Sequence, residues 1–416
     1  MATSPDPCLT KSDLLVWKNL QRDVETSRGA AQTRFPDSTD EATKQTLSDL
    51  NNPKADAFEP TVCTIWDQAD ISPVLSYYLI RPYTEWARTV VRRPTDVVFL
   101  THIILYLGTL LPSAIGLFVR FNWTHAIFHW VLAGYYCGAF TLMLHNHIHN
   151  NGVLAPQYST FDRLWPYILE PLMGHTWDSY YYHHVKHHHV ENNGPGDLSS
   201  TIRYQRDELF DFACYVGRFL FFIWIELPLY FYRKGKQNLA IRSGLTELTS
   251  YFFIYAMARY NLHATIFVLV IPLVQMRIGM MVGNWGQHAL VDEVEPDSDF
   301  RSSITLIDVP SNRHCFNDGY HTSHHLNPKR HWRDHPHAFL QGKDRYKEGR
   351  ALVFEKIDFL GITYHLMKKN YSHLASCLIP IGDQTKLSLA EIEEMLKTKT
   401  RRFSEDDIVR HWGKLR

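Results

Sequence analysis

The sequence predicts an all-α membrane protein with about four transmembrane helices and a cytosolic helical cap that carries grouped histidines. Two observations lead to this fold class. Several apolar runs are long enough to cross a bilayer, whose hydrocarbon core requires about 20 apolar residues. Nine histidines fall within residues 145–189 and eight within residues 288–337, out of 24 in the 416-residue chain, and their spacings repeat with the period of a helix.

The first two apolar runs are the clearest membrane spans. Residues 97–119 carry no charge and contain Pro112 as their only strong helix breaker, and residues 126–144 are also uncharged. In a bilayer, backbone polar groups must be satisfied within the segment, so runs of this kind are predicted to be helices.

Two later apolar runs contain charged residues and are weaker candidates for membrane spans. Residues 212–232 carry two charges, residues 262–283 carry Arg277, and a weaker apolar run lies at residues 248–257. Each could be a buried core helix, but the first two runs already place the chain in a bilayer, which favours membrane spans. The alternative is that residues 212–232 or 248–257 lie in the membrane interface or re-enter the membrane.

The polar ends divide the chain into three predicted parts. Residues 1–94 are expected to form a cytosolic N-terminal arm and an amphipathic lead-in, residues 95–337 the membrane domain, and residues 338–416 a cytosolic C-terminal cap. Residues 1–60 are rich in polar side chains, so we expect a mobile arm with one helix at residues 11–26. This segment lacks the apolar core of a signal peptide.

Charge distribution sets the expected orientation. Arginines between residues 81 and 93 precede the first span and should keep that end in the cytosol. All histidine groups share that side if an even number of crossings separates His188 from His288, and four spans satisfy this condition. The basic residues between 233 and 242 conflict with it, because they would also favour the cytosol.

Charge and cysteine content argue against other classes of protein. The chain has 43 basic and 43 acidic residues, and its basic residues are dispersed, which does not suit nucleic-acid binding. The six cysteines form no C-x-x-C pair, as expected for polar segments that face a reducing compartment. The motifs of serine hydrolases, zinc proteases, phosphate-binding loops and dinucleotide-binding folds are absent from the sequence.

The first histidine group, at residues 145–149, follows the second span. His145 and His149 are four residues apart and would share one face of a helix, whereas His147 points elsewhere. Neutral imidazole is a common ligand of transition metals. This spacing alone is weak evidence, because a polar helix end would also contain it.

The second group is the most specific, because five histidines lie within residues 183–189 and core packing gives no reason for them. An α-helical H-x-x-H-H pattern is one way to align them, and H-x-x-x-H-H, which uses His189, is the alternative. Asn192 or Asn193 could orient a ligand by hydrogen bonding. The predicted ligands of this group are His184, His187 and His188.

Two further groups follow the last span. Asn284 and His288 are four residues apart, and Asn284 could hold a metal-bound water. A second H-x-x-H-H pattern consists of His321, His324 and His325 and ends before Pro328. The later histidines 331, 335 and 337 break the spacing and are expected at the surface.

The number of histidines favours two metal ions. A catalytic zinc takes three protein ligands, so nine histidines exceed the needs of two zinc ions. Two redox-active irons that bind O2 fit the number better. The alternative from another class is a histidine-rich metal-binding membrane protein without enzymatic activity, in which repeated helical spacing would be unusual.

The order H-x-x-x-H, H-x-x-H-H, N-x-x-x-H and H-x-x-H-H between membrane spans resembles the integral-membrane fatty acid desaturase and hydroxylase superfamily, over about residues 95–335. The resemblance implies two iron ions at a di-iron centre on the cytosolic side. It also implies a separate electron donor, such as cytochrome b5 and its reductase, because the H-P-G-G motif of a fused cytochrome is absent. The ligands that it implies are His145, His149, His184, His187, His188, His288, His321, His324 and His325, with Asn284 acting through water.

The expected reaction is the O2-dependent removal of two hydrogens from a lipid acyl chain. A hydroxylase, acetylenase or epoxidase acting on a specialised lipid would use the same ligands, because these reactions differ in how the substrate is held. The expected location is the membrane of the endoplasmic reticulum, with the active site facing the cytosol.

Overall fold

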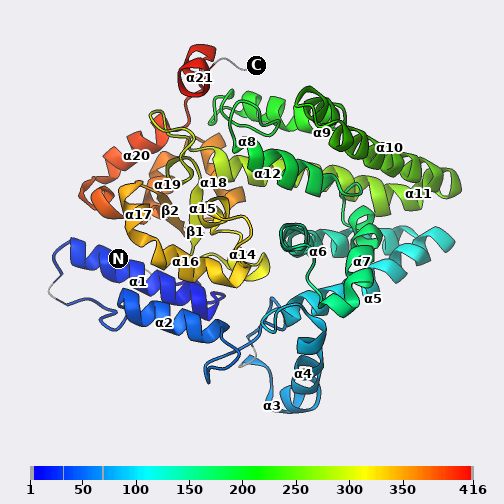
Figure 1. Cartoon of the computed structure of the whole chain (residues 1–416), viewed down its shortest axis with the longest axis horizontal. Helices are drawn as coiled ribbons and strands as arrows, with labels where there is room; N and C mark the ends of the chain where they lie inside the picture. Colours follow the sequence, from blue (N-terminus) through cyan, green and yellow to red (C-terminus); the bar gives the residue numbers. More distant parts are fainter. Residues whose placement is uncertain (1–3, 31, 68–69, 414–416) are drawn as a thin grey trace. The chain divides into compact units, whose positions relative to one another are not determined.

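The computed structural model describes residues 4–30, 32–67 and 70–413, which are mainly helical (Figure 1). Its contacts divide the chain into two compact units. The membrane unit comprises Glu59–Val190 and Gly217–Met280, and the polar unit comprises Met1–Phe58, Glu191–Val216 and Met281–Arg416. Both units are therefore discontinuous in sequence, whereas composition suggested three consecutive parts.

Four helical segments are long and apolar enough to cross a membrane, and they coincide with the four predicted spans. The predicted all-α fold class with four candidate membrane spans is therefore confirmed. The four segments are α5 (Val97–Val119), α6 (Trp123–Asn150), α9 (Leu209–Arg233) and Leu262–His288, which consists of α11 (Leu262–Thr265), the π-helix η5 (Ile266–Val270) and α12 (Ile271–His288).

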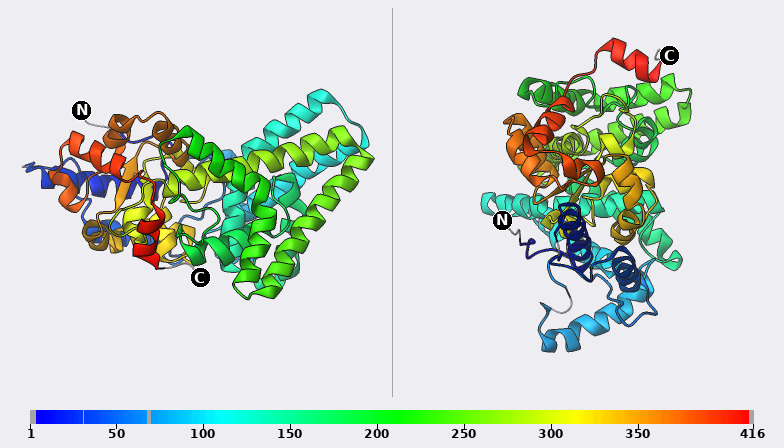
Figure 2. Two further views of the ribbon diagram at one scale, coloured as in Figure 1. Left: turned by 90° about the horizontal axis from the view of Figure 1, so that it is seen from above. Right: turned by 90° about the vertical axis from the view of Figure 1, so that its left-hand side faces the viewer.

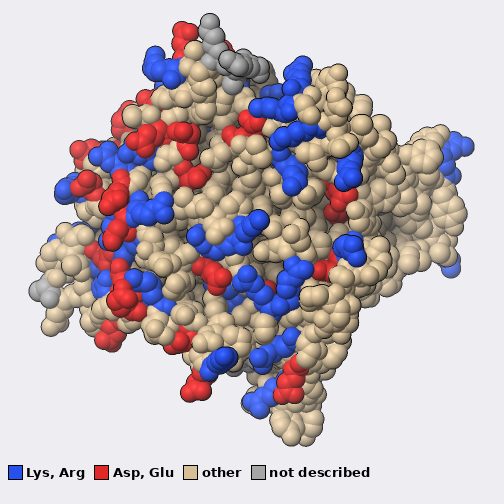
Figure 3. All heavy atoms as spheres, viewed as in Figure 1, with Lys and Arg blue, Asp and Glu red and all other residues tan. Residues whose placement is uncertain are grey.

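The membrane unit also contains shorter helices and one long helix outside this set (Figure 2). Few charged side chains lie on the surface formed by α5, α6 and the long helix α10 (Figure 3). The remaining elements are α3 (Pro73–Leu75), η2 (Ser76–Ile80), α4 (Arg81–Val90), η3 (Pro156–Tyr158), α7 (Ser159–Leu172), η4 (Tyr181–His188), α8 (His189–Glu191, at the unit boundary) and α10 (Gln237–Tyr260).

Helices α5 and α6 form an antiparallel hairpin through a short turn. The side chain of Asn122 caps α6 by accepting a hydrogen bond from the backbone N–H of His125 at 3.1 Å, which satisfies one of the unpaired donors at the helix start. Along the hairpin, the buried ring of Tyr106 packs against Tyr136 at 4.8 Å and Phe140 at 6.0 Å. Aromatic packing thus joins the two helices over about one turn of α6.

A buried ion pair joins α10 to α12. The carboxylate of Glu247 accepts hydrogen bonds from Arg277 at 3.0 and 3.2 Å and from the hydroxyl of Thr176 at 2.8 Å. The two charged side chains are only 7 and 8 % exposed. Each charge is therefore compensated within the unit, as a charge removed from water requires.

The polar unit combines short helices with one small parallel sheet. Strands β1 and β2 pair in register from Ile304↔Leu352 to Ile307↔Glu355. Its elements are α1 (Lys11–Ser27), α2 (Asp40–Asn51), α13 (Asp299–Ser302), β1 (Ile304–Ile307), α14 (Pro310–His314), α15 (His321–Leu326), η6 (Trp332–Asp334), α16 (His335–Gln341), α17 (Lys343–Glu348), β2 (Leu352–Glu355), α18 (Phe359–Met367), α19 (Tyr371–Cys377), η7 (Gly382–Lys386), α20 (Leu389–Thr398) and α21 (Glu405–Trp412).

The N-terminal helices belong to the core of the polar unit. Trp17 and Leu20 of α1 are each 1 % exposed and pack in one cluster with Ile307, Tyr320 and Phe339. The expectation of a mobile arm over residues 1–60 is therefore wrong, whereas the predicted helix at residues 11–26 is confirmed as α1. The polar composition hid a few apolar residues on one helix face that are sufficient for docking.

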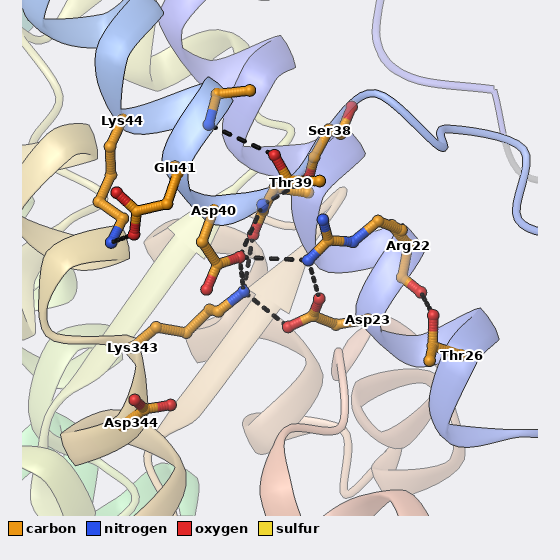
Figure 4. A network of polar contacts seen from close by, with 12 residues as sticks. Arg22, Asp23, Thr26, Ser38, Thr39, Asp40, Glu41, Lys44, Lys343 and Asp344 are labelled. Carbon is orange, nitrogen blue, oxygen red and sulfur yellow. Dashed lines mark hydrogen bonds and ion pairs between the residues drawn. The ribbon is translucent and has the colours of Figure 1, made fainter.

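An ionic network fixes the same helices (Figure 4). The buried ammonium of Lys343 in α17 contacts Asp23 at 2.7 Å and also pairs with Asp40, and it donates to Asn19 at 3.0 Å. Burial alone would raise the pKa of Asp23, but the hydrogen bond from Lys343 outweighs it, and the pKa lies below its usual range. One cation thus ties α1 and α2 to the C-terminal part of the unit.

Arg206 connects three chain segments behind the end of α12. Its buried guanidinium donates to the backbone carbonyls of Ala289 at 2.9 Å and Lys399 at 3.0 Å, and lies 5.6 Å from the ring of Phe403. Both acceptors are backbone carbonyls, and that of Lys399 also accepts a hydrogen bond from the backbone N–H of Val291 at 2.9 Å. These bonds fix the position at which the chain leaves α12, directly after His288.

Candidate metal centre

The first histidine group lies in the last turns of α6, as predicted. His145 and His149 place their ring centroids 4.6 Å apart. The helix ends at Asn150, and Asn151 adopts a left-handed conformation with φ of 53°, which asparagine tolerates better than most residues. The spacing of four residues therefore brings two imidazoles to one face, as expected for an α-helix.

The second group lies in a π-helix, η4, and not in an α-helix. The backbone N–H of His189 donates to the carbonyl of His184, five residues earlier, and this bond defines the π-helical turn. Side chains five residues apart therefore share a face. The Nε2 atoms of His184 and His189 lie 3.1 Å apart, with ring centroids at 4.5 Å.

These two groups meet inside the membrane unit and form the first histidine cluster, which consists of His145, His149, His184 and His189. Neighbouring ring centroids in it are 4.5–5.1 Å apart, and the potential ligand atoms lie within 4.8 Å of one another. Burial, followed by the neighbouring imidazoles, holds the pKa of His184 well below its usual value. The neutral ring that metal binding requires is therefore favoured.

The other predicted ligands of the second group have different surroundings. His188 stacks on His184 at 5.6 Å and lies beside the first cluster. His187 is buried, with its ring 4.2 Å from Tyr230 of α9 and 5.7 Å from His183. The structure thus brings His189 into the cluster and turns His187 toward α9, so the geometry suits the alternative alignment.

The second histidine cluster lies in the polar unit and consists of His288, His321 and His325. The Nε2 atoms of His288 and His321 lie 3.0 Å apart, and the ring of His325 is 4.9 Å from His288 and 4.4 Å from His321. His324 lies farther away, at 6.2 Å from His321. The end of α12 and the short helix α15 thus supply one compact group of imidazoles.

Asn192 orients one ring of this second cluster. Its Oδ1 lies 2.7 Å from Nδ1 of His325, and its Nδ2 donates to Asp299 at 3.0 Å. Burial raises the pKa of Asp299, and the hydrogen bond from Asn192 partly offsets that rise. The contact expected of Asn192 or Asn193 is present at Asn192, and it fixes which nitrogen of His325 carries the proton.

Asn284 is held by hydrogen bonds within the polar unit. Its Nδ2 donates to the hydroxyl of Tyr215 at 2.7 Å and to the carbonyl of Ser199 at 3.0 Å. The amide donors are thereby used, and Oδ1 is the atom that would accept a hydrogen bond from a water. Its predicted role in holding a metal-bound water stays a prediction.

Several histidines outside the clusters have structural contacts. His147 places Nε2 2.9 Å from the carbonyl oxygen of Asp162, whose carboxylate accepts from the backbone of Val153 and Leu154. His335 is buried with Nδ1 2.9 Å from the hydroxyl of Ser323, and His331 is also buried. The expectation that histidines 331 and 335 lie at the surface is therefore wrong, because the chain after Pro328 folds back into the polar unit.

Asp299 and Tyr230 have contacts to the histidine groups that no sequence pattern indicated. Asp299 lies 107 residues from Asn192, and Tyr230 is 43 residues from His187, so neither pair falls within the window of a local motif. The run of five histidines is visible in the sequence, but α-helical spacing does not reveal the longer period of η4.

Both clusters have the donor chemistry of a site for iron or a similar metal. All their side chains offer imidazole nitrogens, three of the seven (His149, His288 and His321) are buried and the other four are half-buried, and pairs of Nε2 atoms face each other at 3.0–3.1 Å. Such nitrogen-rich groups suit divalent transition metals and not calcium or magnesium, which prefer oxygen.

Comparison with known proteins gave one family. The family model described as "Fatty acid desaturase" matches residues 121–356, which is more than half of the chain and contains both clusters. No curated protein and no solved structure matched the chain.

Proposed function

Because the chain belongs to the fatty acid desaturase family, we propose that it is a membrane-bound, O2-dependent di-iron desaturase that removes two hydrogens from a lipid acyl chain. Family membership places it among oxidoreductases that act on fatty acids. The observation that carries the finer proposal is the pair of imidazole clusters, each with two Nε2 atoms 3.0–3.1 Å apart.

In this proposal each cluster holds one iron ion. The π-helical register of η4 supports His189 as a ligand in place of His187. His188 and His324 lie at the edges of the clusters and complete the ligand sets as the sequence predicted. The core ligands are His145, His149, His184 and His189 for one ion, and His288, His321 and His325 for the other.

Iron, when bound, supplies O2 activation and the removal of hydrogen from an unactivated methylene group. The protein keeps the imidazoles neutral and fixed. Burial lowers the pKa of His184, which favours the neutral ring. Asn192 accepts a hydrogen bond from Nδ1–H of His325, which leaves Nε2 as the nitrogen that would bind a metal. Tyr215 holds the amide of Asn284, so that Oδ1 would accept a hydrogen bond from a water.

The chain needs two electrons for each turnover, and we assign their supply to a separate carrier such as cytochrome b5. The chain lacks the fused H-P-G-G motif, which supports a separate donor. The arginines between residues 81 and 93 support a cytosolic position for the start of α5. The location in the endoplasmic reticulum is part of the same proposal.

Expression of the full chain in a host without its own desaturase tests the proposal. Lipid mass spectrometry should detect a new double bond only in the presence of O2, and the purified protein should contain about two irons per chain. His184→Ala should abolish product and lower the iron content, whereas His337→Ala, outside both clusters, should retain both. An alcohol, triple bond or epoxide would favour the related reactions, and a zinc protein without O2-dependent product would refute the proposal.

A further inference from the structure

The α5–α6 hairpin defines two ends of the membrane unit. Its turn at residues 120–122 marks one end, called the turn end here. The other end of α6 carries His145 and His149, which contact η4 through His184 and His189 and define the histidine end. With 28 residues, α6 is about 42 Å long, which exceeds the roughly 30 Å hydrocarbon core of a bilayer.

Helix α10 runs from one end to the other. At its C-terminus, the side chain of Asn261 donates to the carbonyl of Phe118 at 3.4 Å, and the adjoining His263 ring lies 5.3 Å from Phe121 and 5.6 Å from Trp123. The junction of α10 and α11 therefore lies at the turn end. Since α10 has 24 residues and is about 36 Å long, its start at Gln237 reaches the histidine end.

Helix α9 stays at the histidine end. The ring of Phe219 lies 5.1 Å from His183, and the ring of Tyr230 lies 4.2 Å from His187, so both contacts are to the single short helix η4. Phe219 and Tyr230 are separated by about 16 Å along α9. Phe219 lies in the middle of α9 and Tyr230 lies near its C-terminus, so this stretch of the helix stays against η4 at the histidine end and does not lead away from it, as the second half of a crossing helix would.

The surface of α9 suits a bilayer interface. Phe219, Ile223, Leu227 and Phe231 recur every four residues and are at most 6 % exposed, so this stripe packs on protein. The other side of α9 exposes large apolar residues, which are Phe221, Phe222, Trp224, Ile225 and Tyr232. Basic residues follow directly at positions 233, 234 and 236, where they can meet anionic lipid phosphates.

We infer that α10, and not α9, is the third membrane-crossing segment, and that α9 lies along the bilayer surface at the histidine end with its outer aromatic face in the lipid. The crossing segments are then α5, α6, α10 and the segment from α11 to α12, and an even number of crossings separates His188 from His288. The basic residues between 233 and 242 now share a side with the arginines before α5, which removes the conflict noted in the sequence.

The charged residues of α10 lower its hydropathy, so composition did not indicate that this helix crosses the membrane. Glu247 lies near the middle of α10 and would oppose insertion as an isolated carboxylate. In the folded unit, Arg277 and Thr176 satisfy it, so the helix carries no uncompensated charge at that depth. Conversely, α9 is long and apolar enough to meet the criterion for a membrane span, but an interfacial helix with a largely apolar outer face meets the same criterion.

Nitroxide depth measurements on the full chain in liposomes test the inference. In a background without the six native cysteines, spin labels at Phe221→Cys, Ile225→Cys and Tyr232→Cys report on α9. The ratio of each label's accessibility to O2 and to a water-soluble nickel complex gives its depth in the bilayer. Labels at Leu248→Cys and Tyr255→Cys are the matched controls on the exposed face of α10. All five native side chains are exposed, so labelling disturbs little packing.

We expect equal shallow depths along α9 and a depth change of about 10 Å between the two α10 positions. A depth change of about 16 Å from residue 221 to residue 232 would overturn the position of α9, and equal depths on α10 would overturn its crossing. An impermeant maleimide gives a second measurement. Lys234→Cys should react from the side opposite to Asn122→Cys, and reaction of both from one side would also refute the inference.

Discussion

Breaking the ion pair between Glu247 and Arg277 should destabilise the membrane unit far more than removing both charges. Both side chains are less than one-tenth exposed, and three hydrogen bonds of 2.8–3.2 Å converge on the carboxylate of Glu247. Removing one partner of such a pair leaves a buried uncompensated charge, which costs about 3–5 kcal/mol. Glu247→Gln keeps an acceptor for Thr176 and therefore isolates the loss of the negative charge.

A double-mutant cycle measures this coupling. The variants Glu247→Gln, Arg277→Met and their combination are compared with the parent by reversible unfolding in mixed detergent micelles, followed by circular dichroism. The double variant should be destabilised by less than the sum of the single variants, with a difference of about 2–3 kcal/mol in the free energy of unfolding.

The pair Arg203–Glu405 in the polar unit is the matched control, because it has the same chemistry at 3.0 Å but its side chains are 34 and 71 % exposed. Its coupling should be below about 1 kcal/mol. If the Glu247–Arg277 cycle were additive, or no larger than this control, the two charges would not be isolated from water in the way that their burial indicates.

Three further outcomes follow from the site and the polar unit. His189→Ala should lower the iron content by about one ion per chain while His187→Ala preserves it, and the reverse pattern in elemental analysis would restore the α-helical register. Burial raises the pKa of Glu170 from 4.5 to about 8, so the folded state retains a proton that the unfolded chain releases. The free energy of unfolding should therefore fall as pH rises from about 4.5 to 8, by up to about 1.4 kcal/mol per pH unit, and thermal unfolding of Glu170→Gln should lack this slope. Lys343 holds the pKa of Asp23 and Asp40 below the usual value of 3.8, so their stabilisation is present above that pH and is lost as pH falls through the lowered pKa. Lys343→Met should lower the free energy of unfolding by about 1–2 kcal/mol. As the pH is lowered, protease should cleave residues 1–58 of this variant at a higher pH than in the parent. Unchanged cleavage across the acid titration would contradict the role of the network in Figure 4.

Membrane-span hydropathy and helical histidine spacing predicted much of the molecule. The uncharged runs at residues 97–119 and 126–144 became α5 and α6, because length and apolarity alone decide such helices. His145 and His149 met as the α-helical period requires. These features depend on neighbours within one or two turns, which a single sequence contains.

The remaining features depend on partners that are distant in sequence or on an unusual backbone. The period of η4 differs from that of an α-helix, so spacing arguments selected His187 where the structure brings His189 to His184. Glu247 on its own is unfavourable in a membrane helix, and its partner Arg277 lies 30 residues later in the chain. Residues 1–60 looked unstructured because Trp17 and Leu20 find their neighbours in the second half of the chain.

The docking of α1 has a consequence for how the protein is made. The hydroxyl of Tyr320 donates to Asp13 across 307 residues, and the indole of Trp17 donates to Glu355 across 338 residues. At about 5–20 residues per second, ribosomes need roughly 15–60 s to synthesise the chain between such partners. The N-terminal helices therefore remain undocked outside the ribosome while every membrane segment is inserted. During this time the indole of Trp17 is exposed to chaperones. The polar unit can fold completely only near the end of translation. Its assembly is therefore a late step, after the membrane segments have been inserted.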